Sequence, residues 1–284
     1  FAPTYAHMGA LKFFLNTGGD ISAPEIFFLK FFINFPSVFF LLKNIFRKIP
    51  DDKHPQAFYL PSVFGLDSMK KNINIIKQKY AGVSVMESGL LLARTALTGG
   101  FNNLTKVFDN IQAEYERRRA GDDKIPIITD SIEDFRLLKH SAALGEKYKD
   151  IAANAHFVSE FIKPLKVKNK EFGNKKILLQ NNNIFFCNDE IIDKIRQSFI
   201  CGKNKFLVKL ELEAHGAGLL PYCKIKGAQA IKQNLAAALA SRRADVFVVL
   251  SYADKAFFDE LLKVYYPYTK VLHIAELFEY FYGN

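Results

Sequence analysis

The side chains best suited to metal chemistry lie in the C-terminal half of the chain. His215 lies in the turn Glu213-Ala214-His215-Gly216-Ala217-Gly218, with Cys187 before it and Cys223 after it. Imidazole and thiolate groups are ligands of zinc and iron, so His215, Cys187 and Cys223 are candidate ligands of a single metal ion. Their spacing matches no recognised ligand motif. The alternative is that His215 is a hydrogen-bonded turn residue and that the cysteines are small buried hydrophobic residues.

This turn lies inside a predicted strand–helix–strand unit. The alternating apolar residues of 206–212 predict a strand, residues 229–243 predict a helix, and the β-prone run 245–251 predicts a second strand. In such a unit the turns that follow parallel strands meet at one edge of the sheet, where these folds carry their chemistry.

The same layout occurs earlier in the chain and predicts an internal duplication. Here the predicted strand is 83–87, the helix is 101–119 and the second strand is 125–131. Other predicted strands are 57–61, 176–179 and 270–274, and other predicted helices are 66–80, 141–165, 189–199 and 275–282. The alternation predicts an α/β fold with two tandem related domains, each a mostly parallel sheet flanked by helices. We expect the domains to cover 56–165 and 166–284, with helix 141–165 joining the two halves.

An N-terminal hydrophobic segment and linker, residues 1–55, precede these domains. The most apolar part, 25–46, is interrupted by Lys30, Asn34 and Pro36, so it contains no uninterrupted apolar run of the ~20 residues that a membrane span requires. Two short amphipathic helices separated at Pro36 are expected instead. They either pack on the protein or lie on a membrane surface through residues 25–48, which include several basic side chains.

Composition limits the classes of function. The chain has 284 residues and a formal net charge of +10, which suits a solvated lysine-rich surface or an anionic partner. The positive residues are spread along the chain and no nucleic-acid-binding motif is present, so nucleic-acid binding is not the expected function. Three cysteines without a CxxC pair argue against a disulfide framework, so we expect a reducing, cytoplasmic location, with peripheral attachment to the inner membrane as a further option.

Several local sequences resemble the iron–sulfur subunits of the cysteine-rich (CCG) domain family. In each family domain a cysteine follows the first strand, a Cys-Cys-Gly turn follows the next, and another cysteine follows the third. In the first half the corresponding positions hold Val63, Leu91 with Leu92, and Ser131. In the second half Ala214-His215-Gly216-Ala217-Gly218 aligns with Cys-Cys-Gly-x-Gly. Asn183 or Cys187 falls near the leading cysteine, and Ser251 falls near the trailing one.

The family includes lactate-utilisation proteins and iron–sulfur subunits of heterodisulfide reductase, anaerobic glycerol-3-phosphate dehydrogenase and glycolate oxidase. The resemblance implies a scaffold that once held clusters, but iron–sulfur clusters need thiolates and nearly all the ligand positions here lack one. The expectation is therefore a degenerate, cluster-free subunit or accessory protein of a respiratory-type iron–sulfur oxidoreductase. It would act in assembly or protein interaction, with the other subunits of the complex as its partners.

Two alternatives remain open. The first is an active electron-transfer subunit with an iron–sulfur cluster or a single metal ion in the C-terminal domain, at the candidate ligands His215, Cys187 and Cys223. The second is a basic nucleic-acid-binding module, which only the net charge supports.

Overall fold

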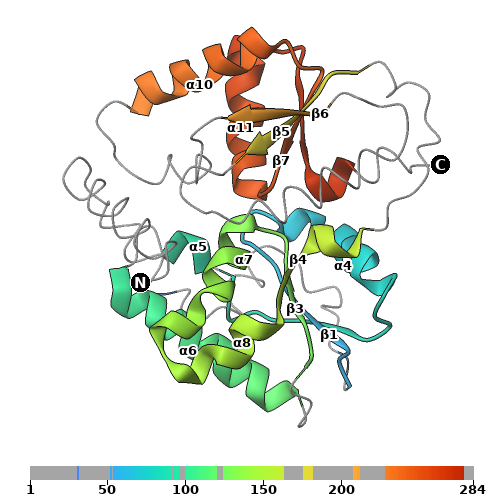
Figure 1. Cartoon of the computed structure of the whole chain (residues 1–284), viewed down its shortest axis with the longest axis vertical. Coiled ribbons are helices and arrows are strands. Elements are labelled where there is room, and N and C mark those ends of the chain that lie inside the picture. Colours follow the sequence, from blue (N-terminus) through green and yellow to red (C-terminus); the bar gives the residue numbers. More distant parts are fainter. Residues whose placement is uncertain are drawn as a thin grey trace. The chain divides into compact units, whose positions relative to one another are not determined.

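The computed structural model describes the greater part of the chain (Figure 1). The described residues are 52, 54–90, 92–95, 100–119, 124–162, 175–181, 207–211 and 228–277, together with Phe31. Apart from Phe31, the hydrophobic segment expected at 25–46 lies outside the described residues, as does the helix expected at 189–199. In the part of the chain that the structure describes, no helix is both long enough and apolar enough to cross a lipid bilayer.

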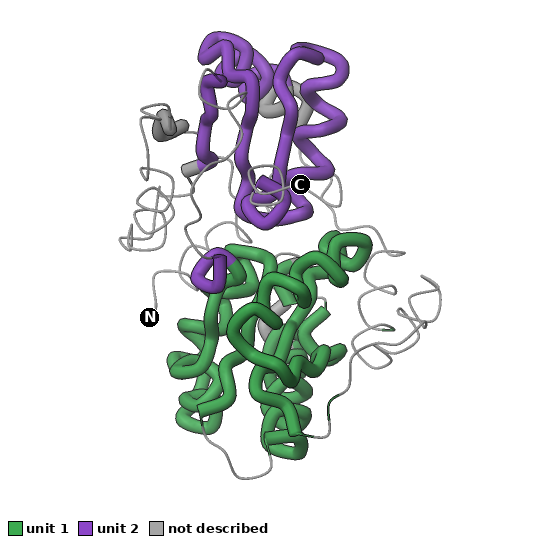
Figure 2. The backbone as a smooth tube through the Cα atoms, turned by 90° about the vertical axis from the view of Figure 1, so that its right-hand side faces the viewer, with its two compact units in different colours: residues 1–158, 221–225 green, residues 159–220, 226–284 purple. Residues whose placement is uncertain are grey.

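The described residues form two compact units, which Figure 2 shows in green and purple. The first unit contains the described residues up to Val158, and the second contains those from Ser159 onward. Each unit is built around its own four-stranded sheet.

The sheet of the first unit is entirely parallel. Its strands are β1 (Ala57–Leu60), β2 (Val83–Val85), β3 (Ile127–Thr129) and β4 (Ala155–Phe157). They lie in the order β2-β1-β3-β4. The strands are short apolar runs, and the side chains of β1, β2 and β3 are all buried, as expected for a parallel sheet covered on both faces.

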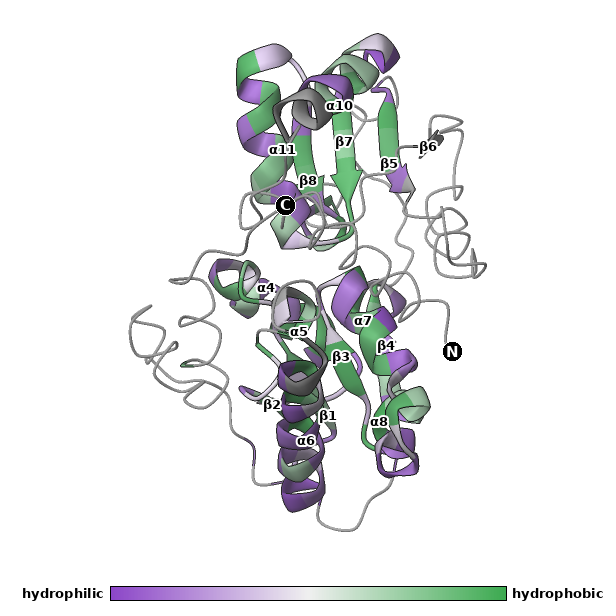
Figure 3. Ribbon diagram, turned by 90° about the vertical axis from the view of Figure 1, so that its left-hand side faces the viewer, coloured by the Kyte–Doolittle hydropathy of each residue, from purple (hydrophilic) through white to green (hydrophobic). Residues whose placement is uncertain are grey.

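Helices connect these strands. They are η1 (Leu66–Ser68), α4 (Met69–Lys77), α5 (Leu92–Arg94), α6 (Gly100–Arg118), α7 (Ile132–Lys139), η3 (Ser141–Leu144), η4 (Glu146–Tyr148) and α8 (Lys149–Asn154). The 3₁₀ helix η5 (Val158–Phe161) follows the last strand, β4. In α4 the apolar residues recur at helical spacing, and Ile73 and Ile76 are buried. Figure 3 shows the same pattern more widely, with hydrophobic strands inside and hydrophilic positions along the outer face of α6.

The expectation of one long helix over 141–165 is wrong. The structure has instead two 3₁₀ turns, the short helix α8, strand β4 and the 3₁₀ helix η5. Gly145 is in an extended conformation between the 3₁₀ turns and interrupts helical geometry there. Residues 155–157 complete the sheet by pairing with β3, because hydrogen bonding to a buried parallel strand outweighs the local preference for helix.

The sheet of the second unit repeats the first. Its strands are β5 (Ile177–Asn181), β6 (Leu207–Glu211), β7 (Val246–Val249) and β8 (Lys270–His273), all parallel in the order β6-β5-β7-β8. Phe58 of β1 pairs with Ile127 of β3, and Leu178 of β5 pairs with Phe247 of β7. Each position of the first pair therefore has its counterpart 120 residues later in the chain. The duplication and the α/β fold class predicted from the sequence are therefore confirmed.

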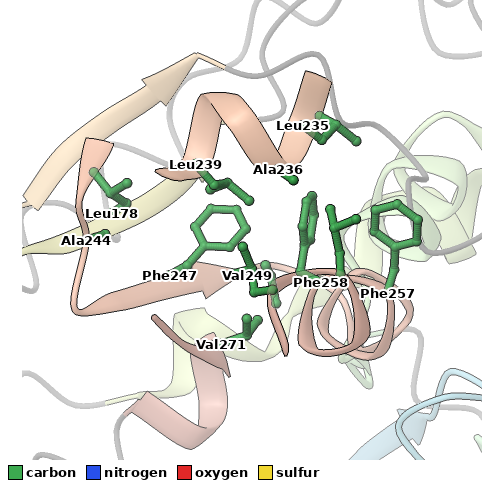
Figure 4. Close-up of a cluster of buried hydrophobic side chains, with 12 residues drawn as sticks. Leu178, Leu235, Ala236, Leu239, Ala244, Phe247, Val249, Phe257, Phe258 and Val271 are labelled. Carbon is green, nitrogen blue, oxygen red and sulfur yellow. The ribbon is translucent and has the colours of Figure 1, made fainter. Parts of the chain in front are cut away.

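Helices α10 (Ala228–Arg242) and α11 (Tyr252–Tyr265) pack on this sheet. Their apolar residues form a core with the strands (Figure 4), in which Phe258 lies edge-on to Phe247 at a ring-centroid distance of 5.0 Å. Helices α7 and α11, which follow β3 and β7, have no counterpart among the predicted elements.

Candidate functional site at the carboxyl edge of the first sheet

The strand order places a topological switch point at the same position in both units. The chain leaves β1 toward β2 on one side and leaves β3 toward β4 on the other, and β5 and β7 repeat this arrangement. In open parallel sheets the connections that leave the carboxyl ends of two such strands run in opposite directions, and ligands bind in the crevice between them. A candidate site is therefore expected among the residues that follow β1, β2 and β3.

Three of the predicted cluster positions follow neighbouring strands at this edge. Val63 lies half-buried in the turn after β1, Leu92 is fully buried at the start of α5 after β2, and Ser131 is buried just after β3. Ser251 holds the position of Ser131 in the second unit, just after β7. The other predicted positions, Leu91, Ala214, His215, Cys187 and Cys223, lie outside the described residues.

The polar centre of the edge is Asp130, a fully buried carboxylate that follows β3. Its Oδ2 accepts hydrogen bonds from the hydroxyl of Tyr59 at 2.6 Å and from Nδ2 of Asn72 at 3.0 Å. Its Oδ1 accepts from the backbone N–H of Ser62 at 2.8 Å. Asn72 also donates to the Tyr59 hydroxyl at 2.9 Å. The carboxylate therefore links β1, the turn after it, helix α4 and β3.

Gly65 lies directly against this carboxylate. A Cβ atom at position 65 would lie 2.1 Å from Oδ2 of Asp130, far inside any allowed contact. Glycine is required here because the backbone itself approaches the carboxylate. The carboxylate is thus enclosed by the β1–α4 turn.

Asp134, in the first turn of α7, is the second buried carboxylate of the edge. Its Oδ1 accepts from the backbone N–H of Ala93 at 2.7 Å, and this bond joins α7 to α5. Burial raises the pKa of Asp134 well above its ordinary value, and the negative charge of Asp130 raises it further. Burial also raises the pKa of Asp130, to about 6, against the opposing effect of the hydrogen bonds from Tyr59 and Ser62.

The two units share a Ser-x-x-Asp sequence at this edge. Oγ of Ser131 accepts from the N–H of Asp134 at 3.2 Å, and Oγ of Ser251 accepts from the N–H of Asp254, also at 3.2 Å. Both serines are therefore N-caps, which satisfy a free N–H at the start of α7 or α11. The Asp254 carboxylate accepts from Nε2 of Gln180 in β5 at 3.0 Å, which fastens α11 to the sheet.

The units differ at the position before the capping serine. Asp130 precedes Ser131, whereas the buried Leu250 precedes Ser251. The hydrogen-bonded carboxylate centred on Asp130 is therefore a feature of the first unit that the second unit does not repeat at Leu250.

The histidines and carboxylates of the described ranges do not gather into a metal site, and all three cysteines lie outside those ranges. Within those ranges, no group of three or more His, Cys, Asp or Glu side chains is arranged to hold a metal ion. The buried His273 stacks on Tyr252 with ring centroids 3.9 Å apart, and its Nδ1 accepts from the backbone N–H of Ala275 at 3.2 Å. That nitrogen therefore has a structural role at the end of β8.

Sequence reasoning missed the residues that dominate this edge, namely Asp130, Asp134, Asn72 and Tyr59. One signal was present, because Asp130 follows the apolar run Ile127–Thr129 directly and so lies at a strand end. The repeated Ser-x-x-Asp sequence was a second signal. Nothing in the sequence indicates that Tyr59 and Asn72 meet Asp130.

Comparison with known proteins identifies no family for this chain. No protein-family model matches this chain, and no curated protein matches it. The resemblance to the CCG family therefore remains an expectation from the sequence.

The capping role of Ser251 gives a first testable prediction. We expect Ser251→Ala to lower the free energy of unfolding of the second unit by about 1 kcal/mol, because the N–H of Asp254 loses its acceptor. Urea unfolding followed by circular dichroism would measure the change. The matched control is Ser241→Ala, since Ser241 is exposed and bonds only within its own helix to the carbonyl of Ala238. Equal effects of the two substitutions would contradict the capping role.

Proposed function

We propose that this chain is a cluster-free subunit or accessory protein of a respiratory-type iron–sulfur oxidoreductase, acting in assembly or in protein interaction. The proposal rests on the resemblance to the CCG domain family, in which cysteines at the strand ends hold clusters. The observation that carries it is the structural role of the two serines that stand where the family has the cysteine after the third strand. The Oγ atoms of Ser131 and Ser251 each accept a hydrogen bond from an N–H group at the start of a helix, so both side chains stabilise the fold.

The position of Leu92 supports the same proposal. Its side chain is fully buried where the family has part of its Cys-Cys-Gly turn. Burial of a leucine side chain contributes roughly 1.5–3 kcal/mol to stability, so packing at this place can stabilise a scaffold without a cluster.

Metal and sulfide analysis tests the proposal. We expect protein purified without oxygen to contain no stoichiometric iron or acid-labile sulfide and to lack visible absorption. Clusters are bound through thiolates, and Val63, Leu92, Ser131 and Ser251 supply none. A brown protein with several irons per chain would overturn the proposal.

A single iron or zinc per chain would favour the alternative of an active electron-transfer subunit. In that case His215→Ala is expected to release the metal, and Cys187→Ala and Cys223→Ala would show which thiolates bind it. Unchanged metal content in all three variants would exclude these residues as the ligands.

A further inference from the structure

Three turns lie side by side where β5, β7 and β8 begin, at the amino-terminal edge of the second sheet. The N–H of Asp245 donates to the carbonyl of Lys176 at 2.9 Å, and the N–H of Lys270 donates to the carbonyl of Asp245 at 2.9 Å. Oγ1 of Thr269 donates to the carbonyl of Ala244 at 2.6 Å. These bonds hold the turns together as one surface, opposite the carboxyl edge where Ser251 lies.

Positive charge gathers on this surface. Its basic residues, which are widely separated in the sequence, are Lys175, Lys176, Arg242, Arg243, Lys263 and Lys270. The nearest acid in these turns, Asp245, accepts a hydrogen bond from the backbone N–H of Lys176 at 2.6 Å. Basic residues in the last turn of a helix also suit the helix dipole, which accounts for Arg242 and Lys263 but not for Lys175 or Lys270.

Aromatic and aliphatic side chains project into solvent on the same surface. Tyr268 is 82 % exposed, Val264 is 75 % exposed and Tyr265 is 43 % exposed. Tyr266 and Tyr268 lie edge to face with ring centroids 5.8 Å apart. We call these residues, with the six basic ones, the basic tyrosine edge. An exposed tyrosine face among cations is suited to stack on a planar group that carries negative charge beside it.

We propose that the basic tyrosine edge binds single-stranded nucleic acid, with Tyr268 and Tyr265 stacking on bases while the lysines and arginines contact phosphates. This function is independent of the one proposed above. Single strands are favoured over duplexes because only unpaired bases offer a free face to a tyrosine ring. The sequence argument against nucleic acid was that the positive residues are dispersed, and the fold brings six of them to one edge.

The size of the surface sets the expected binding mode. Neighbouring strands are about 4.8 Å apart, so the turns before β5, β7 and β8 span about 10 Å. That length accommodates only a few nucleotides, and contacts to phosphates and base faces carry no base-edge readout. Binding is therefore expected to be sequence-tolerant and strongly dependent on salt.

Fluorescence anisotropy with the full chain and a labelled deoxythymidine oligomer of about 20 nucleotides, at about 50 mM salt, tests the proposal. We expect Tyr268→Ala to weaken binding about tenfold and Tyr268→Phe to retain it, because phenylalanine preserves the stacking face. We expect Lys263→Ser with Lys270→Ser to reduce the slope of log K against log salt by about 1.4, which is two phosphate contacts at about 0.7 each.

The matched control is Lys77→Ser with Lys70→Ser in the first unit. Lys77 lies in the last turn of α4 as Lys263 lies in the last turn of α11, and both control lysines are exposed. The control is expected to leave the slope unchanged. Absence of binding by the wild type, equal slopes in the two double variants, or full binding by Tyr268→Ala would each overturn the proposal. Binding that polyglutamate displaces equally well from the wild type and from Tyr268→Ala would show an acidic-peptide surface without base stacking, and would overturn it as well.

Discussion

Between pH 4 and pH 8 the unfolding free energy of the wild-type protein is expected to fall by about 2.4 kcal/mol relative to that of the Asp130→Asn variant. Burial raises the pKa of Asp130 from 3.8 to about 6 in the folded protein. The native state therefore binds the proton more tightly than the unfolded chain does. The stabilisation that the protonated Asp130 contributes is fully present below about pH 3.8 and is lost as the pH rises through about 6.

The comparison with asparagine removes this carboxyl group together with its effect on the pKa of Asp134. An amide at position 130 has the same shape and no titratable proton, so the variant lacks this part of the pH dependence. Its absolute stability will also reflect the contact with Nδ2 of Asn72, because two amide nitrogens cannot both donate into the same bond. Therefore only the way in which the difference in unfolding free energy between the wild type and the variant changes with pH reports on the titration. That change includes the part of the raised Asp134 pKa that the charge of Asp130 causes.

Urea unfolding at a series of pH values, followed by circular dichroism, would measure the effect. Hydrogen exchange resolved by peptide would show that it arises in the segments containing β1 and β3. The control is Asp67→Asn, which removes an exposed carboxylate in η1, just before α4. If the difference in unfolding free energy between the wild type and Asp130→Asn stays constant with pH, Asp130 is not protonated in this range.

The second large effect is expected in the core of the second unit. Phe258→Ala should lower the unfolding free energy of that unit by about 3–5 kcal/mol, the usual cost of truncating a buried phenylalanine. Phe258 is fully buried and packs edge to face against both Phe247, at 5.0 Å, and Phe257, at 5.1 Å. Loss of the ring removes both contacts and leaves a cavity between α11 and β7.

Urea unfolding with peptide-resolved hydrogen exchange across β7 would measure this loss. The control on the same helix is Val264→Ala, where the side chain is 75 % exposed and the expected change is about 0.5 kcal/mol or less. A Phe258→Ala loss below about 1 kcal/mol would mean that the core collapses around the missing ring far more completely than large-to-small substitutions normally allow.

The fold was predictable where one local pattern decides the outcome. The apolar runs of β1, β3 and β7 and the periodic residues of α4, α6 and α10 all appear close to their predicted positions. Strand β4 was not predictable in this way, because three residues after a short helix carry little local signal and gain their conformation by pairing with β3.

The polar edge of the first sheet was less predictable for a similar reason. The bond between Tyr59 and Asp130 joins residues 71 positions apart, and the bond between Asn72 and Asp130 joins residues 58 positions apart. Neither pair is marked by composition or periodicity. The adjacency of β1 and β3, which creates the meeting place, follows from the strand order and not from any one segment.

The 120-residue interval between the two sheets has a consequence for synthesis on the ribosome. All four strands of the first sheet precede Val158, so its hydrogen bonding requires no later strand. At about 5–20 residues per second, the first sheet has a lead of roughly 6–24 s over the second. That lead exceeds the folding time of most small domains, so the nascent chain can bury the strands of the first sheet before the corresponding strands of the second emerge to compete for pairing.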